Sequence, residues 1–324
     1  MEPKDYSISI LMPTYNNVCV GLVETLRAQC ESIARRGAKR LVYEIVVADD
    51  GSTDSRTVAE NRAINALDHC RFIERKANSG RSAIRNFLTK ESCGEWLLFI
   101  DSDVVIGCDD FIGRYLDSNA TTVVCGGISP GRYPDTLRHN LRYKYEWTEA
   151  HRHTAKARSR AEHKCFRTTN FMVRRDIMLD NPFDETITAY GYEDVMFGKR
   201  LCEKGVAVVH IDNPVVLADY EDNLRFVAKT EESLRTLFQF KDRLSGYSSL
   251  LGFTDKMARI GLPDTRLGKT NTRSGKPNMR FGLTAALLAW HKLAGKLERK
   301  NLTGKHPSLL VFKIYKIGYY ISLK

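Results

Sequence analysis

The residues Trp96-Leu97-Leu98-Phe99-Ile100-Asp101-Ser102-Asp103 set five consecutive apolar side chains directly before two aspartates. A run this apolar indicates a strand buried on both faces, as in a parallel sheet. Residues i and i+2 of an extended segment point the same way, so Asp101 and Asp103 are expected to present their carboxylates together. Such hard oxygen ligands suit Mg²⁺ or Mn²⁺. A solvated turn that caps the next helix is the alternative reading.

Short apolar, β-branched runs on either side of this strand alternate with helical patterns. We expect strands at residues 8–12, 43–48, 71–74, 96–100 and 121–125, and helices at 18–36, 55–67, 80–91 and 109–118. This alternation predicts an α/β fold built from βαβ units, with a mostly parallel sheet flanked by helices. Ligands of such sheets bind beyond the carboxyl ends of the strands, which makes acidic residues at those ends candidates for function.

The regular pattern fades between residues 128 and 165 and then resumes. We expect a strand at 171–173, a helix near 194–204, a strand at 206–211 and a long helix near 221–243. The segment from residue 132 to residue 167 is basic, with ten Lys and Arg residues: Arg132, Arg138, Arg142, Lys144, Arg152, Lys156, Arg158, Arg160, Lys164 and Arg167. His151 and His153 lie among them, where the positive surroundings disfavour a metal. Binding of acceptor phosphate groups and a merely solvated basic helix explain these charges equally well.

The net charge of +11 is concentrated in the last part of the chain. Residues 251–324 hold 15 Lys and Arg against 3 Asp and Glu, whereas residues 1–250 hold 35 against 36. A Gly/Pro/Ser-rich patch predicts a linker over residues 251–280, and residues 281–324 follow as a basic, helical C-terminal extension with amphipathic segments at 281–300 and 307–322. Such segments either lie on an anionic membrane or pack against the catalytic domain.

The eight cysteines are scattered and contain no Cys-x-x-Cys pair. This usage is typical of reduced, buried thiols. The chain shows no charged-then-apolar leader, and no stretch reaches the roughly 18 apolar residues of a membrane span. We therefore expect a cytoplasmic location.

Two further acidic motifs stand beside regular elements. Asp49-Asp50-Gly51-Ser52-Thr53-Asp54 follows the strand at 43–48; a carboxylate there could accept the imide N–H of uracil or a ribose hydroxyl, or the motif caps the helix at 55–67. Tyr190-Gly191-Tyr192-Glu193-Asp194 precedes a helix. Its two acids either favour the helix dipole or supply a base for an acceptor hydroxyl.

The three acidic motifs, read in order with Pro13-Thr14-Tyr15-Asn16 and with the stretch from Asn78-Ser79-Gly80 to Arg85-Asn86, carry a resemblance that no single motif does. Over roughly residues 7–245 the chain resembles glycosyltransferase family 2. Members of that family have the GT-A fold, take nucleotide-sugar donors and invert the anomeric centre by direct displacement. The resemblance implies a catalytic domain at 1–250, with a nucleotide-sugar-binding half at 1–127 and an acceptor-binding half at 128–250.

The resemblance also implies a role for each motif residue. The nucleotide-sugar donor would be bound by Pro13, Thr14, Tyr15, Asp49, Asp50, Asn78, Gly80, Arg85, Asp101 and Ser102. Asp103 and Asp101 would hold the metal, with Asp103 ahead of Asp101 as the direct ligand. Asp194 would be the general base, and Glu193 would contact the acceptor or the sugar.

His210 matches a place where some GT-A enzymes supply a third metal ligand, although a packed or solvated histidine is the commoner outcome. Similar proteins often carry a further histidine just after the position of Asn213-Pro214-Val215, and this chain reads Val216-Leu217-Ala218-Asp219 there. Whatever that histidine does elsewhere has no counterpart here.

We therefore expect an inverting, metal-assisted glycosyltransferase that takes a UDP-sugar and serves cell-surface polysaccharide or lipid-linked oligosaccharide assembly. The acceptor would be a saccharide or lipid-linked hydroxyl, with peripheral contact between residues 281–324 and an anionic membrane. A nucleotidyltransferase is the alternative enzyme, but the first strand is followed by Pro13-Thr14-Tyr15-Asn16-Asn17 rather than a basic phosphate loop. A nucleic-acid or membrane-binding protein acting through the basic tail is the alternative class; no nucleic acid is expected, because the acid clusters would then have no purpose.

Overall fold

The computed structural model describes residues 5–36, 40–260 and 282–324. These residues form two compact units. The first contains Met1–Arg138 and Arg142–Tyr220, and the second contains His139–Leu141 and Glu221–Lys324. Each unit is described by itself below.

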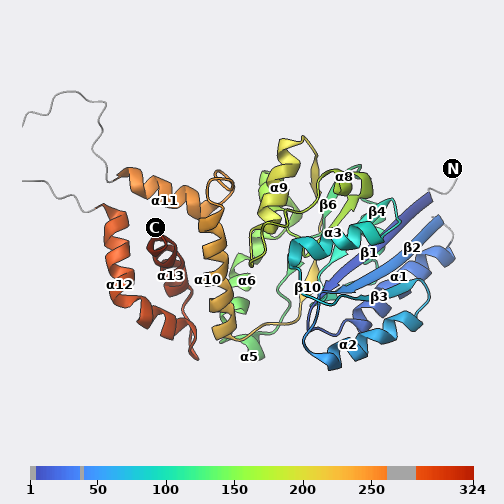
Figure 1. Ribbon diagram of the computed structural model, residues 1–324, viewed down its shortest axis with the longest axis horizontal. Helices are drawn as coiled ribbons and strands as arrows, with labels where there is room; N and C mark the ends of the chain where they lie inside the picture. Colours follow the sequence, from blue (N-terminus) through green and yellow to red (C-terminus); the bar gives the residue numbers. More distant parts are fainter. Residues whose placement is uncertain (1–4, 37–39, 261–281) are drawn as a thin grey trace, which may run out of the picture. The chain divides into compact units, whose positions relative to one another are not determined.

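The first unit is built on a seven-stranded sheet (Figure 1). Its strand order is β3-β2-β1-β4-β8-β6-β9. The strands are β1 (Asp5–Thr14), β2 (Arg40–Asp49), β3 (Cys70–Glu74), β4 (Trp96–Ile100), β6 (Val123–Cys125), β8 (Asn170–Arg174) and β9 (Val208–His210). Only β8 runs antiparallel to its neighbours, β4 and β6. The expected mostly parallel α/β sheet is confirmed.

Helices cover both faces of this sheet because its strands are apolar on both sides. Along β1, Ile8, Ile10 and Met12 join one buried cluster, whereas Leu11 joins the other. The first cluster includes residues of α1 (Val20–Arg36) and α4 (Phe111–Leu116). The second includes residues of α3 (Arg81–Glu91), α8 (Arg175–Asp180) and α9 (Glu193–Glu203). The expected helix at 55–67 is shorter, since α2 (Ser55–Asn61) gives way to a 3₁₀ turn at Arg62–Ala66.

A second, three-stranded sheet was not expected from the sequence. It pairs β5 (Val104–Ile106), β10 (Val215–Leu217) and β7 (Ile128–Ser129) in the order β5-β10-β7. Strands of two or three residues are too short to show an alternation of apolar and polar positions. The basic stretch is likewise more regular than expected, because it folds into short helices: α5 (Pro134–Leu137), α6 (Leu141–Glu149), α7 (Ala155–Arg158) and 3₁₀ turns at Ala150–Arg152 and Ser159–Cys165.

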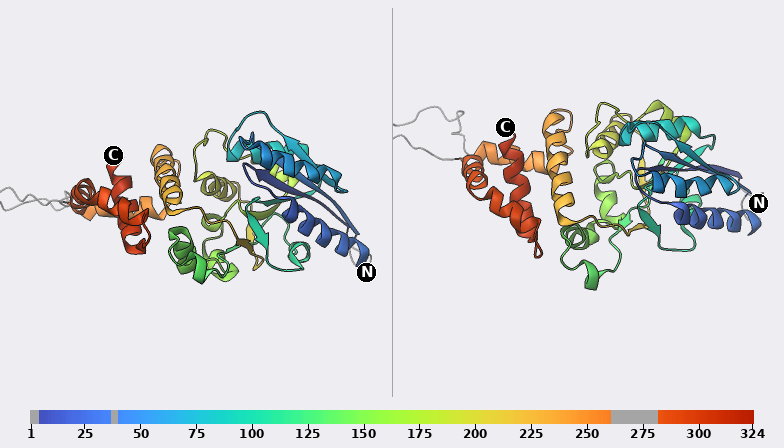
Figure 2. Two further views of the ribbon diagram at one scale, coloured as in Figure 1. Left: turned by 90° about the horizontal axis from the view of Figure 1, so that it is seen from below. Right: turned by 60° about the horizontal axis from the view of Figure 1, so that its bottom comes forward.

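The second unit consists of helices: α10 (Asn223–Gln239), α11 (Ser249–Ile260), α12 (Leu283–Leu302) and α13 (Leu309–Ser322). The views in Figures 1 and 2 show α12 and α13 side by side. Glu231 of α10 joins them, since its Oε1 accepts hydrogen bonds from Arg299 Nε at 2.8 Å and from the Tyr315 hydroxyl at 2.6 Å. Among the described helices, none is long and apolar enough to cross a bilayer.

The observed division differs from the expected boundary at residue 250. Helix α10 belongs with α12 and α13 because it packs against them rather than within the first unit. Residues 251–260 continue helix α11, so they are not linker; the rest of the expected linker, residues 261–280, lies outside the described residues. The helical C-terminal extension is confirmed as α12 and α13.

Candidate functional site

The loops that follow β1, β2 and β4 are tied to one another at the carboxyl edge of the large sheet. The side-chain oxygen of Asn16 accepts from the backbone N–H groups of Thr53 and Asp54, each at 2.9 Å. Asn17 Nδ2 donates to the Ser102 carbonyl at 2.7 Å. These bonds bring the Pro13–Asn16, Asp49–Asp54 and Asp101–Asp103 motifs to one place, as the order of the strands predicts.

Asp49 closes β2 and is 3% exposed. Its carboxylate accepts from the Ser52 backbone N–H at 2.9 Å and from the Ser52 hydroxyl, so it shapes the turn that follows. Gly51 lies in this turn at φ +70°, and a Cβ there would stand 2.5 Å from the carbonyl carbon of Ala77. Glycine is required because two loops meet at this point.

Asp50 has a different role from the base contact expected of it. Its carboxylate accepts from Arg75 Nη1 at 3.0 Å, from the Ser79 N–H at 3.0 Å and hydroxyl at 2.7 Å, and from the Gly80 N–H at 2.9 Å. These four bonds engage both carboxylate oxygens. Asp50 therefore positions the Asn78–Gly80 loop, and its expected contact with the nucleotide stays a prediction.

The Asn78–Gly80 loop leads into α3, with Gly80 at φ +89° as its N-cap. The Asn78 side-chain oxygen accepts from the Gly80 N–H at 3.2 Å. One turn into the helix, the side chain of Arg85 is 2% exposed and its Nη2 donates to Asp101 Oδ1 at 2.7 Å. Arg85 therefore orients the first aspartate of the pair.

Asp101 and Asp103 lie close enough to repel each other. Burial, followed by the charge of Asp101, raises the pKa of Asp103. The positive charges of Arg142 and Arg81 act in the opposite direction, and a divalent metal would stabilise the ionised pair further. Over residues 5–36, 40–260 and 282–324, no group of three or more His, Cys, Asp or Glu side chains is arranged around a metal. The donor set therefore fits a metal held by one or two carboxylates, with remaining positions for phosphate oxygens.

Glu193 and Asp194 open helix α9 after a strained turn. Gly191 has φ +97° and Tyr192 has φ +70°, a left-handed conformation that costs free energy for a residue with a Cβ. Burial and the neighbouring charge of Glu193 raise the pKa of Asp194 to about 6. A carboxylate tuned toward neutral pH is suited to accept a proton.

Arg81 is a site residue that the sequence reasoning missed. Its Nη1 lies 3.8 Å from Glu193 Oε1, and its guanidinium stacks over the Tyr190 ring at 4.8 Å. Its positive charge lowers the pKa values of both Asp103 and Asp194, which places it between the two acidic pairs. The available signal was its position as the first residue of α3, directly after Gly80.

His210 contacts other protein groups in this structure. Its Nδ1 accepts from Arg158 Nη1 at 2.6 Å, and its Nε2 donates to the Glu162 carbonyl at 2.9 Å. Both ring nitrogens are therefore occupied, and burial lowers the pKa of His210 to about 4, which keeps the ring neutral. These contacts argue against the expected third metal ligand, which stays a prediction, because a buried arginine from the basic stretch binds this ring.

The basic stretch contributes structure as well as charge. Arg158 is 4% exposed and donates to backbone carbonyls of Cys125, Gly126 and Ile211. His153 faces Glu146 at 3.3 Å. A small hollow lies beside them, lined by Cys125, Gly127, Ile128, His153, Arg158, Cys165, Arg167 and Asn170. Arg167 also acts on Asp194, whose pKa its charge lowers, so part of this stretch borders the base.

The sequence profile described as Glycosyl transferase family 2 matches residues 9–181. Poly(ribitol-phosphate) beta-glucosyltransferase of Bacillus spizizenii is 36% identical over 110 residues, which are 33% of this chain and 16% of that protein. Glycosyltransferase AglE of Haloferax volcanii is 23% identical over 209 residues, 62% of this chain and 63% of that protein. The chain thus spans less than two thirds of these curated relatives.

Among solved structures, the chain is similar to the mannosyltransferase PcManGT from Pyrobaculum calidifontis, which was determined in complex with GDP-Man and Mn²⁺. The TM-score is 0.50 at 14% identity, covering 99% of this chain and 87% of the other. At this identity the likeness concerns the fold. It supports the GT-A architecture expected from the sequence.

Proposed function

Because the chain belongs to glycosyl transferase family 2, we propose that it moves a sugar from a nucleotide-sugar donor to an acceptor hydroxyl, with inversion at the anomeric carbon. One observation carries the proposal. Arg81 and Arg85 lie one turn apart on α3, with Arg85 2.7 Å from Asp101 and Arg81 3.8 Å from Glu193, so this helix brings the Asp101/Asp103 pair close to the pair that contains Asp194. A donor site and a base site are thereby adjacent.

The donor would lie over the carboxyl edge of β1, β2 and β4. Pro13, Thr14 and Tyr15 would border the nucleotide, with the Asp49 turn beneath the base. The diphosphate and the sugar would be faced by Asn78, Gly80 and Arg85. Ser102, beside the diphosphate, is connected to the loop after β1 because its carbonyl accepts a hydrogen bond from Asn17. Arg81 is added to this set, because an exposed guanidinium at the start of a helix suits a phosphate.

Asp103, and the oxygen of Asp101 that Arg85 leaves open, would hold Mg²⁺ or Mn²⁺. When bound, the metal supplies Lewis acidity that neutralises charge on the departing nucleoside diphosphate. Arg81 and Arg85 complement this role because they keep positive charge beside the same phosphates. Arg85 also fixes the Asp101 side chain, so the pair is oriented before the donor arrives.

Asp194 would accept the proton of the acceptor hydroxyl as its oxygen attacks the anomeric carbon. One bond forms between the acceptor oxygen and that carbon, and the bond from the carbon to the diphosphate oxygen breaks. The electron pair leaves with the nucleoside diphosphate, and the proton remains on Asp194. Glu193 would contact the acceptor or the sugar, and its charge raises the pKa of the base.

The acceptor proposed is a saccharide or lipid-linked hydroxyl in surface polysaccharide assembly, with a UDP-sugar as donor. Support comes from the basic border near Arg167 and from relatives whose names refer to poly(ribitol-phosphate). The proposal includes a cytoplasmic location, since all eight cysteines, which the described residues include, are free thiols.

The test is hydrolysis and transfer across a panel of UDP- and GDP-sugars, with Mn²⁺, with Mg²⁺ and with EDTA. We expect release of nucleoside diphosphate from a UDP-sugar, abolished by EDTA and by Asp103→Asn. The matched control is Asp109→Asn, an exposed acid that follows strand β5. Activity that survives EDTA would remove the metal role of Asp103. Release of pyrophosphate from a nucleoside triphosphate instead would establish the nucleotidyltransferase.

A further inference from the structure

Helix α12 displays a line of apolar residues on its outer surface. Leu283, Ala286, Trp290, Leu293 and Leu297 follow one another at spacings of three and four residues, and all five are exposed. Leu293 is 83% exposed and Leu297 is 70% exposed. At 3.6 residues per turn the five side chains share an arc of about 80°. We call this line the α12 apolar stripe.

The opposite side of α12 is the side that packs within the second unit. Gly295, Glu298 and Leu302 are buried there. A Cβ added to Gly318 of α13 would stand 2.8 Å from the His291 side chain, which shows how closely the two helices approach on that side. The apolar stripe is therefore surplus to the core of the unit, and contiguous exposed apolar surface of this kind marks an interaction site.

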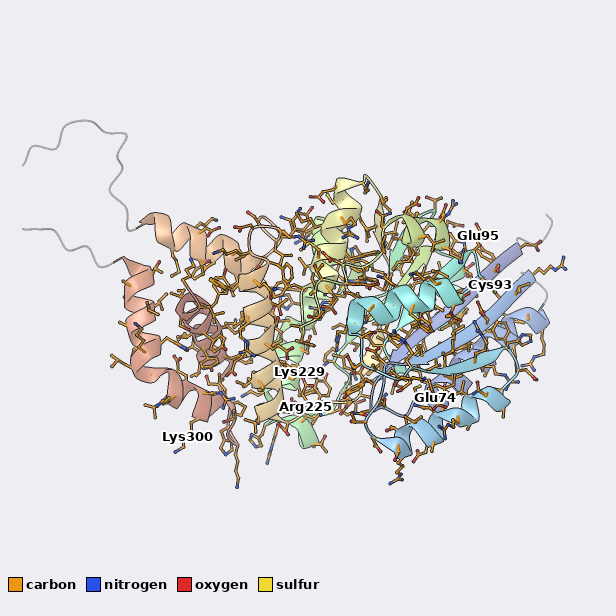
Figure 3. All side chains as sticks on the ribbon, in the orientation of Figure 1. Glu74, Cys93, Glu95, Arg225, Lys229 and Lys300 are labelled. Carbon is orange, nitrogen blue, oxygen red and sulfur yellow. The ribbon has the colours of Figure 1, made fainter. Side chains whose placement is uncertain are left out.

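A row of lysines runs along one edge of the stripe. Lys292, Lys296 and Lys300 are exposed and recur every four residues, which aligns them on the helix surface. Figure 3 labels Lys300 near the C-terminal end of α12. Residues 283–324 contain eight Lys and Arg but a single acid, Glu298, which is buried and accepts a hydrogen bond from Trp290 Nε1 at 2.8 Å. Within residues 283–324, no other acid offsets the charge of the row.

We propose that the α12 apolar stripe and its lysine row dock on an anionic lipid surface. A bilayer places an apolar layer beneath a plane of negative headgroups, and the stripe with its adjacent lysines has the complementary order. A second copy of the chain is disfavoured, because pairing two such helices would oppose two strongly basic segments. Leucines and a tryptophan enter the interface, while the lysines extend to the phosphates.

The docking is independent of catalysis, because no residue of the stripe or of the lysine row belongs to the acidic site. If the proposed function holds, docking raises the local concentration of a lipid-linked acceptor around the enzyme, because both would be bound to the same membrane surface. Either claim can fail without the other. Donor hydrolysis in solution is therefore measured on every variant alongside its lipid binding.

The test is co-sedimentation of the full chain with vesicles of phosphatidylcholine, alone or mixed with phosphatidylglycerol. We expect binding only to the mixed vesicles. The double variant Leu293→Ser, Leu297→Ser should weaken it roughly tenfold or more through lost apolar burial. The triple variant Lys292→Gln, Lys296→Gln, Lys300→Gln should weaken it roughly tenfold or more through lost attraction to the headgroups.

Matched controls change exposed leucines and lysines elsewhere. Leu179→Ser with Leu224→Ser, and Lys76→Gln with Lys90→Gln and Lys204→Gln, should bind as the unaltered chain does. The proposal is overturned if the unaltered chain ignores phosphatidylglycerol, or if the stripe variants bind vesicles normally. It is equally overturned if the chain ignores vesicles but forms dimers in sedimentation velocity that Leu293→Ser, Leu297→Ser dissociates.

Discussion

Two adjacent carboxylates at the start of α9 differ in what they can do. Glu193 is 6% exposed and faces Arg81, whereas Asp194 has the pKa raised to about 6. Burial and the negative charge of Glu193 together raise the pKa of Asp194, which makes Asp194 the carboxylate suited to accept a proton. This division arises from the turn at Tyr192, whose left-handed backbone starts the helix with both acids in its first turn.

The first prediction concerns the pH dependence of transfer. Asp194 can accept a proton only when ionised, so kcat/KM should rise with pH and level off, with a midpoint near the pKa of about 6. Glu193→Gln should move this midpoint to lower pH, because it removes a negative charge that raises the pKa. Initial rates between pH 4.5 and 8.5 measure both curves. A flat profile in the unaltered chain would contradict the assignment.

The second prediction concerns His210. His210→Ala should leave Mn²⁺ affinity unchanged but lower the free energy of unfolding at pH 8 by about 2–4 kcal/mol, because Arg158 and the Glu162 carbonyl lose their partner. The folded-state pKa of about 4 lies below the ordinary 6.5, so this stabilisation is complete above pH 6.5 and declines as pH falls toward 4. Denaturant titrations at several pH values, with calorimetry of Mn²⁺, check it. Reduced Mn²⁺ affinity would restore the ligand role.

At the scale of single residues, the sequence shows which acidic residues are candidates for the site more readily than it shows what each of them binds. Asp103 is recognisable because it comes shortly after a buried strand. Asp194 is recognisable because it lies in the first turn of a helix. The sequence does not show that Asp50 and His210 bind other protein groups. Asp50 accepts hydrogen bonds from Ser79 and Gly80, and His210 accepts one from Arg158. Each of these partners lies at least 29 residues away in the chain. Only the folded loops reveal that these groups are already satisfied.

At the scale of elements, the site depends on loops that touch one another rather than on the strands alone. The turn after β2 carries Asp49 and Asp50, and Gly51 lets it meet the loop that leads into α3. Asn16 and Asn17 then connect the loop after β1 to the loops after β2 and β4. Four segments are thereby held in one arrangement before any ligand binds, which lowers the cost of ordering them.

The third prediction tests this contact with a pair of glycines. Gly51→Ala should cost about 2–4 kcal/mol of stability and weaken donor binding, because the new methyl group adds a clash with the Ala77 backbone to the cost of its left-handed φ. Gly205→Ala has a similar φ of +66° but open space, so it should cost only about 1 kcal/mol and leave donor binding intact. Thermal unfolding and donor calorimetry give both values. Equal effects would show that loop contact is unimportant.

Long buried elements are the ones that sequence patterns predict. The strand at 96–100 and the helix at 80–91 were expected within one residue of β4 and α3, because burial makes their periodicity clear. Strands β5, β7 and β10 were missed since each has two or three residues. Helix α6 was missed because its basic side chains hide an apolar face formed by buried residues such as Leu141 and Tyr143, and α7 was missed because it has only four residues.

At the scale of the whole molecule, charge and chemistry are divided between two units. The unit that contains the acidic site lies within residues 1–250, whose net charge is close to zero. The excess of Lys and Arg over Asp and Glu lies in residues 251–324. The sequence revealed this division of charge but not the boundary between the units. Helix α10 looked like the last catalytic helix, and only its contacts through Glu231 assign it to the second unit.

The fourth prediction follows from Glu231. Glu231→Ala should destabilise the second unit by about 2–3 kcal/mol, because Arg299 and Tyr315 lose a shared acceptor. Amide hydrogen exchange should accelerate in α10, α12 and α13 and stay unchanged in β1, β2 and β4, with donor hydrolysis preserved. Glu203→Ala, which removes a surface ion pair with Lys199, is the control and should change neither. Faster exchange throughout the sheet would show that the two units unfold together.

We propose that Asp194 is the base of a sugar transfer at the edge of this sheet. Its most direct test is the transfer rate of Asp194→Asn measured beside Asp180→Asn, an exposed acid at the end of α8, with donor affinity determined for both. Asparagine keeps the shape but cannot take the proton, so transfer should fall by about 10²-fold or more while donor affinity is retained. Asp180→Asn should transfer at the normal rate. Near-normal turnover by Asp194→Asn would contradict the account and place the base on another residue.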